Sequence, residues 1–144
     1  MSLVGAYDDG NIFAKIIRGE APCAKVYEDE DVIAFLDLFP QARGHTLVIA
    51  KDARARNILD IEPEALSKLI RGVQTVAKGL EAALKPDGIV VTQFNGVAAG
   101  QTVFHLHFHL LPRMEGVALA GHGSARMADP AELAALAKEI GAAM

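Results

Sequence analysis

The sequence lacks tryptophan, has one cysteine among its 144 residues, and contains no apolar run that approaches the length of a membrane-spanning helix. The lone Cys23 cannot form a disulfide within the chain, which is typical of a protein from a reducing compartment. Because crossing a bilayer takes roughly twenty consecutive apolar residues, we expect no membrane segment. The start, MSLVGAYDDG, has neither the basic nor the apolar region of a secretory signal, and we expect its first residues to fray. These absences predict a cytoplasmic protein.

Clustered basic charge is also missing. The chain has 14 Lys and Arg against 18 Asp and Glu, a formal net charge of −4, and only the scattered group of Lys51, Arg54 and Arg56 brings basic residues near one another. Binding to long nucleic acids depends on such charge, so we predict that nucleic acid is not a partner. The remaining composition, 51% hydrophobic and 22% charged, is that of an ordinary globular protein short enough for one domain.

Apolar periodicity predicts three helices. Residues 11–18 have apolar side chains at helical spacing, and residues 63–84 repeat them with the 3.6-residue period over a long segment that begins at a proline. A third helix begins after Asp129, which is a suitable N-cap with a glutamate three residues later. Its apolar stripe consists of Leu133, Leu136, Ala137 and Ile140.

Five apolar or β-branched runs predict strands, and turn-forming residues separate them. The runs cover residues 24–28, 32–38, 45–50, 88–95 and 103–111. We expect consecutive strands to pair in the antiparallel sense. A meander of this kind covered by helices is an α+β layout.

Three of the five histidines occupy alternate positions, 105, 107 and 109. On a strand alternate side chains share one face, so the imidazoles form a row while Leu106 and Phe108 enter the core. Histidines two residues apart on a strand can also present nitrogen ligands to zinc. A catalytic zinc site usually has an acidic residue close by, and none is evident in the flanking sequence. The row alone leaves nucleophilic chemistry and metal binding both open.

The row and its surroundings resemble the histidine-triad (HIT) family. Residues 105–111, His-Leu-His-Phe-His-Leu-Leu, match the family signature at every position. Further segments resemble the family's other landmarks in the same order, and they are residues 11–20, 34–37, 44–51 and 100–102. The resemblance implies one HIT-like α+β domain with a core from about residue 10 to 114 and a helical tail from about 115 to 144. It implies an antiparallel five-stranded sheet, a short N-terminal helix, one long central helix and a C-terminal helix.

The resemblance also implies catalytic roles. His107 would attack an α-phosphorus as a neutral imidazole and form a transient nucleotidyl-histidine, while its other nitrogen donates to the backbone carbonyl of His105. His109 would contact the phosphate and protonate the departing group. His45 would support the triad from a neighbouring strand. Neither a metal nor another cofactor is required by this chemistry.

A second set of residues would bind the nucleotide according to the same resemblance. Asp37 would accept hydrogen bonds from both ribose hydroxyls. Asn95, Gln101 and Thr102 would bind phosphate or leaving-group oxygens. Apolar side chains, which could equally be plain core residues, would form the walls of the base pocket. These side chains are Ile12, Phe13, Phe35 and Leu38.

The chain departs from the family pattern in two places. Some bacterial relatives hold a structural zinc with a Cys-x-x-Cys pair, but these positions are Asn11 and Ala14 here, so we expect no structural zinc. The phosphoramidase branch often has a C-terminal tryptophan that reaches across the dimer, and this chain has none. His122 matches no landmark and is interpreted as an exposed loop residue.

The resemblance implies hydrolysis of purine nucleoside phosphoramidates, which are adducts of AMP or GMP, by a homodimer of the kind usual in the family. The N-terminal half is most similar to that branch. Residues 99–103 and 111–113 resemble instead the dinucleoside polyphosphate hydrolases, which would use the same nucleophile. Two alternatives belong to other classes: a nucleotide-sensing binding module with little turnover, and a zinc hydrolase or cupin-like metalloprotein.

Overall fold

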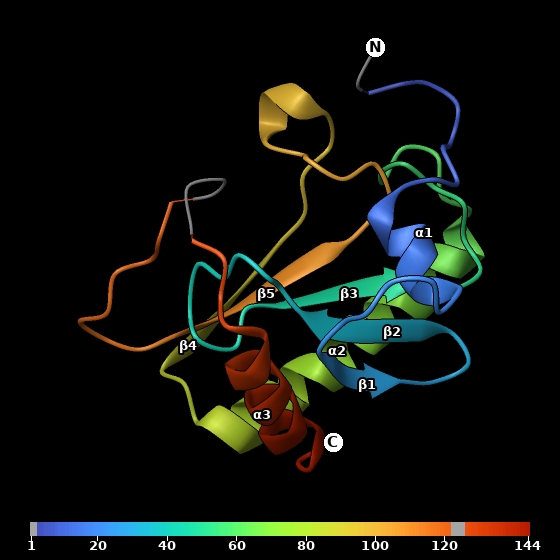
Figure 1. Cartoon of the computed structure of the whole chain (residues 1–144). Helices are drawn as coiled ribbons and strands as arrows, with labels where there is room; N and C mark the ends of the chain where they lie inside the picture. Colours follow the sequence, from blue (N-terminus) through green and yellow to red (C-terminus); the bar gives the residue numbers. More distant parts are fainter. Residues whose placement is uncertain (1–2, 122–125) are drawn as a thin grey trace.

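A five-stranded antiparallel sheet with strand order β1-β2-β3-β5-β4 forms the centre of the computed structural model, which describes residues 3–121 and 126–144 (Figure 1). Every neighbouring pair of strands is antiparallel. The strands are β1 (Lys25–Glu28), β2 (Val32–Leu36), β3 (Thr46–Ala50), β4 (Gly88–Thr92) and β5 (Phe108–Arg113). The predicted α+β class and the five strands are confirmed. The expected meander is wrong in one place, because β3 pairs with β5 rather than with β4, the next strand along the chain.

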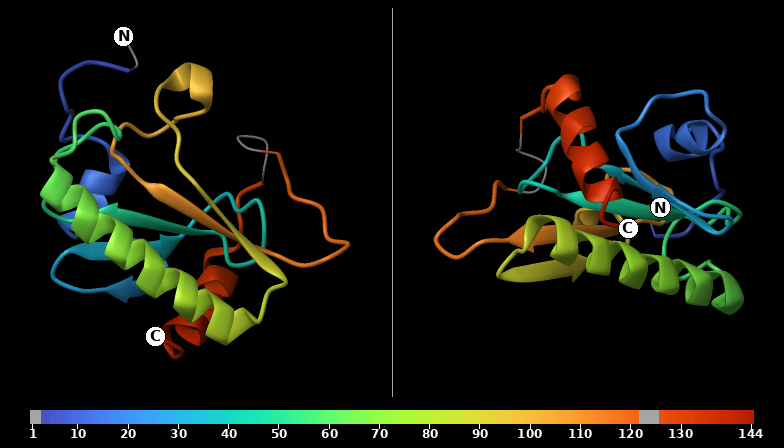
Figure 2. Two further views of the ribbon diagram at one scale, coloured as in Figure 1. Left: turned by 180° about the vertical axis from the view of Figure 1, so that it is seen from behind. Right: turned by 90° about the horizontal axis from the view of Figure 1, so that it is seen from below.

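Helices cover both faces of this sheet. Figure 2 shows α1 (Ile12–Ile17) and α2 (Pro63–Leu84) on opposite sides, and α3 (Pro130–Gly141) packs against β1 and α2. A short 3-10 helix, η1 (Val97–Ala99), lies between β4 and β5. The bounds of α2 are those predicted from its apolar period. Among the described residues, no helix has both the length and the apolar character needed to cross a membrane.

The two faces of β2 and β3 enter two separate hydrophobic clusters. Every residue of both strands is buried, which requires cover on both sides of the sheet. The larger cluster joins alternate strand residues such as Val32 and Val48 to α2 and α3. The smaller cluster joins Ile33 and Phe35 to Phe13 of α1. α1 therefore lies on the face opposite to the long helix.

The predicted strand over residues 103–111 begins later than expected. β5 starts at Phe108, and β3 pairs only with its first three residues. The chain before it is held differently, because the Leu106 N–H donates to the Ala55 carbonyl at 2.9 Å rather than to a strand. His105 and His107 therefore precede the ladder that was expected to hold them.

Four other sequence-based expectations concern element ends, the N-terminus and a loop. β2 ends at Leu36 rather than residue 38, because Asp37 begins a turn in which its Oδ1 accepts the Phe39 N–H at 2.8 Å. β4 ends at Thr92 rather than residue 95. The N-terminal residues from 3 onward are anchored rather than frayed, since the Leu3 carbonyl accepts the Asn57 side-chain amide at 2.9 Å. His122 lies outside the described residues.

The contact between α2 and β2 generates a stability prediction at Gly72. A Cβ added at this helical position would lie 2.7 Å from both Val32 methyl groups, and Val32 is fully buried. Gly to Ala in a helix interior ordinarily stabilises by about 1 kcal/mol, but overpacking a core costs roughly 1–3 kcal/mol. We expect Gly72→Ala to lower the free energy of unfolding measured by urea denaturation.

Gly88→Ala is the matched control for this prediction. A Cβ at Gly88 meets no atom within 4 Å, so this variant should be at least as stable as the wild type. A Gly72→Ala protein with wild-type stability would contradict the close packing of α2 on β2.

Candidate active site

The three histidines of the row are buried side by side on the α1 face of the sheet. The ring centroids of His107 and His109 are 4.9 Å apart, and Phe13 of α1 lies edge-on to His107 at 4.8 Å. Leu106 and Phe108 point into the larger cluster on the other face. The alternation predicted from the sequence is therefore present, although only His109 belongs to β5.

A backbone carbonyl fixes the tautomer of His107. Its Nδ1 lies 2.7 Å from the carbonyl oxygen of His105, and a carbonyl can only accept a hydrogen bond. The Nδ1 atom therefore carries the proton of the neutral ring. The Nε2 atom keeps its lone pair, which is the form that a nucleophile needs.

A second chain of hydrogen bonds gives His109 the opposite tautomer. The Gln41 backbone N–H donates to His45 Nδ1 at 3.1 Å, so a neutral His45 carries its proton on Nε2. His45 Nε2 lies 2.9 Å from His109 Nδ1 and therefore donates to it. His109 must then hold its own proton on Nε2. His107 thus has a lone pair on Nε2, while the adjacent His109 has a proton on Nε2.

His105 is kept neutral by its surroundings. Burial, together with the neighbouring His107, lowers the pKa of His105 to about 4. Its Nδ1 lies 2.6 Å from the hydroxyl of Tyr7, and the ring also hydrogen-bonds the backbone carbonyl of Ala50. Tyr7 could not be identified from the sequence, because no spacing or motif connects it with a residue 98 positions later.

Asp37 follows β2 and lies beside the His45–His109 pair. One of its carboxylate oxygens is 3.5 Å from His45 Nε2, and the side chain is partly exposed. This is the nearby carboxylate that the flanking sequence did not reveal. Ligand atoms from Asp37, His45 and His109 all lie within 4.8 Å of one another, so the cluster has the composition of a metal site.

The hydrogen bonds of His45 do not fit a metal at this cluster. Coordination through His45 Nε2 would need a lone pair on that atom and would move the proton to Nδ1. The proton would then face the Gln41 backbone N–H, placing two donors opposite each other at 3.1 Å. Asn11, at one position of the family's cysteine pair, accepts the Ala14 N–H and caps α1. No step of the chemistry below passes through a metal.

The side chain of Gln101 is directed into the protein rather than toward a ligand. Its Oε1 accepts the Gly96 N–H at 2.8 Å, and its Nε2 donates to the carbonyls of Arg56 at 2.7 Å and Val103 at 3.0 Å. Both amide hydrogens are therefore used, and the predicted hydrogen bond from this amide to phosphate is not available in this arrangement. Gln101 instead shapes the loop between β4 and β5, on which Thr102 is exposed.

The remaining predicted nucleotide contacts differ in their accessibility. Asn95 Oδ1 accepts the Ile58 N–H at 3.0 Å and so joins two loops near the triad. The predicted base-pocket residues divide into a buried aromatic pair and two exposed aliphatic side chains. Relative exposures are 6% for Phe13, 3% for Phe35, 46% for Ile12 and 41% for Leu38.

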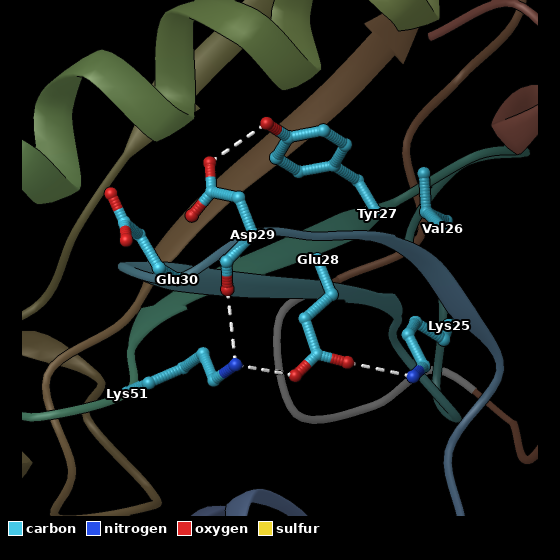
Figure 3. Close-up of a pocket in the computed structure, with 7 residues that line it drawn as sticks. All are labelled: Lys25, Val26, Tyr27, Glu28, Asp29, Glu30 and Lys51. Carbon is cyan, nitrogen blue, oxygen red and sulfur yellow. Dashed lines mark hydrogen bonds and ion pairs between the residues drawn. The ribbon is translucent and has the colours of Figure 1, made fainter.

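One surface hollow lies outside this constellation, and another reaches it at His45. The first, about 660 Å³ in volume, lies over β1, and its charged groups bond one another, as Lys51 and Lys25 both do with Glu28 (Figure 3). No histidine of the row lines it. The second, about 640 Å³, lies between α3 and the residues 40–45 and reaches His45. The paired charges of the first hollow leave it without evident chemistry.

An open antiparallel sheet that presents alternating histidines beside a carboxylate defines the histidine-triad class of nucleotide-binding hydrolases. Residues 18–116 match the HIT domain, and the chain belongs to the HIT family. Several solved structures are similar over nearly the whole chain. The Hit-like protein of Bartonella henselae is 51% identical with a TM-score of 0.90, covering 97% of this chain and 100% of that one.

A second such structure is a Zn-bound histidine-triad family protein from Mycobacterium smegmatis. It is 33% identical with a TM-score of 0.78, and the match covers 93% of this chain and 92% of that one. Among sequence relatives, the adenylylsulfatase HINT3 of Arabidopsis thaliana is 36% identical over 104 residues, which are 72% of this chain and 52% of the relative. Relatives thus include one that holds zinc and one named for cleavage of an adenylyl compound.

Whether the protein binds zinc at Asp37, His45 and His109 can be tested directly. Because His45 Nε2–H is used in the bond to His109, we expect the purified protein to contain no stoichiometric zinc, and dialysis against EDTA to leave its melting temperature unchanged. Elemental analysis and calorimetry measure the two quantities. Co-purification of one zinc per chain, with a melting temperature that falls on chelation, would contradict these tautomers.

Proposed function

We propose that the protein hydrolyses purine nucleoside phosphoramidates, in which an amine is bonded to the α-phosphorus of AMP or GMP, through a covalent intermediate on His107. The observation that carries this proposal is the pair of opposite tautomers on neighbouring rings. His107 is held with a lone pair on Nε2 by the His105 carbonyl, and His109 is held with a proton on Nε2 by His45. A nucleophile for the phosphorus and a hydrogen-bond donor for the departing nitrogen act together when a P–N bond breaks.

In the first step His107 Nε2 attacks the phosphorus as the bond from phosphorus to the amine nitrogen breaks. The leaving nitrogen has taken up a proton from solvent, and as it departs as a neutral amine its new lone pair accepts a hydrogen bond from His109 Nε2–H. The new imidazolium on His107 has phosphorus on Nε2 and a proton on Nδ1, so its positive charge faces the His105 carbonyl at 2.7 Å. That hydrogen bond strengthens as charge develops, which is where a catalytic interaction is most effective.

In the second step water attacks the same phosphorus. The water loses a proton to solvent, which balances the proton taken up in the first step, and the bond from phosphorus to His107 breaks. The electron pair returns to His107 Nε2, and a nucleoside monophosphate is released. His107 regains its starting tautomer and His109 keeps its own, so the hydrogen bonds from the backbone need not rearrange between turnovers.

The nucleotide would lie between the end of β2 and α1. Asp37 is partly exposed next to His45, and a carboxylate in that place can accept from two ribose hydroxyls. The exposed faces of Ile12 and Leu38 suit a flat base, with Phe13 and Phe35 beneath them. Thr102 and the backbone of the loop shaped by Gln101 and Asn95 would receive the phosphate.

The homodimer is also part of this proposal. β4 forms one edge of the sheet, and Val90 and Val91 on it are 39% and 49% exposed. An exposed apolar edge strand invites pairing with a second strand. We propose that two copies join there, each with one catalytic domain and a helical tail from about residue 115, in the cytoplasm.

The choice of leaving group rests on His109 and on the relatives. A poor leaving group such as an amine depends on protonation of its nitrogen and on a hydrogen-bond donor such as His109 Nε2–H, whereas the sulfate of an adenylyl sulfate or the phosphates of a dinucleoside polyphosphate leave as stable anions. The relative named adenylylsulfatase supports the adenylyl half of the substrate. Residues 99–103 and 111–113, which resemble the polyphosphate hydrolases, make those compounds the second candidates.

His107→Asn should abolish turnover while leaving the binding site in place. We expect kcat for an AMP phosphoramidate to fall by about a thousandfold or more, because the nucleophile is lost, while the Kd for AMP stays within about threefold. Steady-state kinetics and titration calorimetry measure the two effects. The wild type should also give a higher kcat/KM for the phosphoramidate than for diadenosine polyphosphate or adenylyl sulfate.

Two results would decide against parts of this proposal. A His107→Asn variant with turnover within about tenfold of wild type would eliminate covalent catalysis by this residue. A wild type that binds AMP tightly but turns over none of the three substrates would favour the nucleotide-sensing module. A higher kcat/KM for diadenosine polyphosphate than for the phosphoramidate would leave His107 as the proposed nucleophile but would make dinucleoside polyphosphates the substrate.

A further inference from the structure

We propose that Tyr7 is a positioning residue for the nucleophile, acting through His105; this inference rests on the proposed function. Tyr7 lies in the N-terminal arm, defined here as residues 3–11, outside the segment that matches the HIT domain. Its hydroxyl lies 2.6 Å from His105 Nδ1, and the rings meet edge to face with centroids 5.7 Å apart. No role among the residues described above accounts for this contact.

The direction of the hydrogen bond follows from the other side of the His105 ring. Nδ1 faces Tyr7, so Nε2 is the atom that bonds the Ala50 carbonyl, and a carbonyl accepts. A neutral imidazole has one N–H, which Nε2 uses on Ala50. The Tyr7 hydroxyl therefore donates to the lone pair of Nδ1. Both ring nitrogens of His105 are bonded, one to the sheet and one to the arm.

This anchoring is needed because His105 precedes the sheet. β5 begins at Phe108, so the peptide that presents the His105 carbonyl is held outside the strand ladder, where the Leu106 N–H of this peptide donates to the Ala55 carbonyl at 2.9 Å. That carbonyl is the acceptor for His107 Nδ1. A rotation of the His105 backbone would remove the acceptor and release the proton of His107 to either nitrogen. Fixing the side chain of His105 at both ends restrains the backbone atom that selects the nucleophilic tautomer.

The arm itself is attached so that Tyr7 can serve this purpose. Asn57 donates to the Leu3 carbonyl at 2.9 Å, and Arg56 donates to the Ala6 carbonyl at 3.3 Å. The Arg54 guanidinium lies 5.3 Å from the centre of the Tyr7 ring and pairs with Asp9 at 2.9 Å. Figure 1 shows the arm running beside the loop between β3 and α2 and then over α1. Contacts on both sides of Tyr7 hold its hydroxyl against His105.

Tyr7→Phe removes the hydroxyl and keeps the ring on which Arg54 and His105 pack. With an AMP phosphoramidate as substrate, we expect kcat to fall about threefold to tenfold and KM to stay within about twofold, the kinetic equivalent of one lost hydrogen bond in the transition state. Tyr27→Phe is the matched control. It removes a hydroxyl bonded at 2.7 Å to Asp29, away from the triad, and should leave both constants unchanged.

Nitrogen-15 NMR of the histidine side chains reads the tautomers without substrate. In the wild type, His107 should show a proton on Nδ1 alone. In Tyr7→Phe, the His105 Nδ1 resonance should move toward that of a non-bonded nitrogen, and His107 should show a mixture of tautomers. Tyr27→Phe should give the wild-type spectrum.

The two measurements separate this inference from the function on which it rests. Wild-type kcat and an unchanged His107 tautomer in Tyr7→Phe would overturn the positioning role, as would a raised KM with kcat unaltered. If the wild type hydrolyses no phosphoramidate, the proposed function fails, and the spectra alone decide whether Tyr7 selects the tautomer.

Discussion

A neutral imidazole has one proton for two nitrogens, and the site is organised by this constraint. Whatever bonds one nitrogen decides what the other can do. The His105 carbonyl accepts a hydrogen bond from His107 Nδ1–H, which leaves a lone pair on His107 Nε2 for nucleophilic attack. The Gln41 N–H bonds His45 Nδ1, so His45 Nε2–H donates to His109 Nδ1 and the proton of His109 is on its Nε2. Because the His105 carbonyl and the Gln41 N–H are backbone groups, the fold determines which histidine is the nucleophile and which is the donor.

The fold supplies these partners from segments far apart in sequence. His45 lies directly before β3 and bonds back to the turn after β2, since its carbonyl accepts the Asp37 N–H at 2.9 Å. The turn is supported by the C-terminal region, where Ala128 N–H donates to the Leu38 carbonyl at 2.8 Å and Gln41 exchanges hydrogen bonds with Ala120. The loop that carries the decisive Gln41 N–H is therefore held on both sides.

Local signals in the sequence were sufficient where local forces decide the structure. The apolar period of residues 63–84 gave the bounds of α2, and the capping side chains of Asn11 and Asp129 bond the first turns of α1 and α3 as their residue types suggest. The alternation of His105, His107 and His109 survives because side chains alternate in extended chain even where no strand pairs with it.

Contacts between side chains far apart in the sequence could not be predicted from local sequence patterns. Gln101 was expected to face phosphate because the family resemblance implies it, yet three backbone groups bond its amide. Tyr7 lies in a segment expected to fray, and its partner is 98 residues away. Asp37 is 72 positions before His109, so its place beside the histidines depends on the pairing of β2, β3 and β5. No periodicity or motif states such distances.

The central claim is that His107 itself becomes bonded to phosphorus, and trapping that species tests it most directly. Wild-type protein mixed with an AMP phosphoramidate is quenched within the first turnover in alkaline denaturant, digested and examined by mass spectrometry. The account predicts a nucleotidyl group on the peptide that contains His107, formed before product appears and lost on brief acid treatment, as expected of a phosphorus–imidazole bond. Product formation without any such adduct, or an adduct on a different residue, would contradict it.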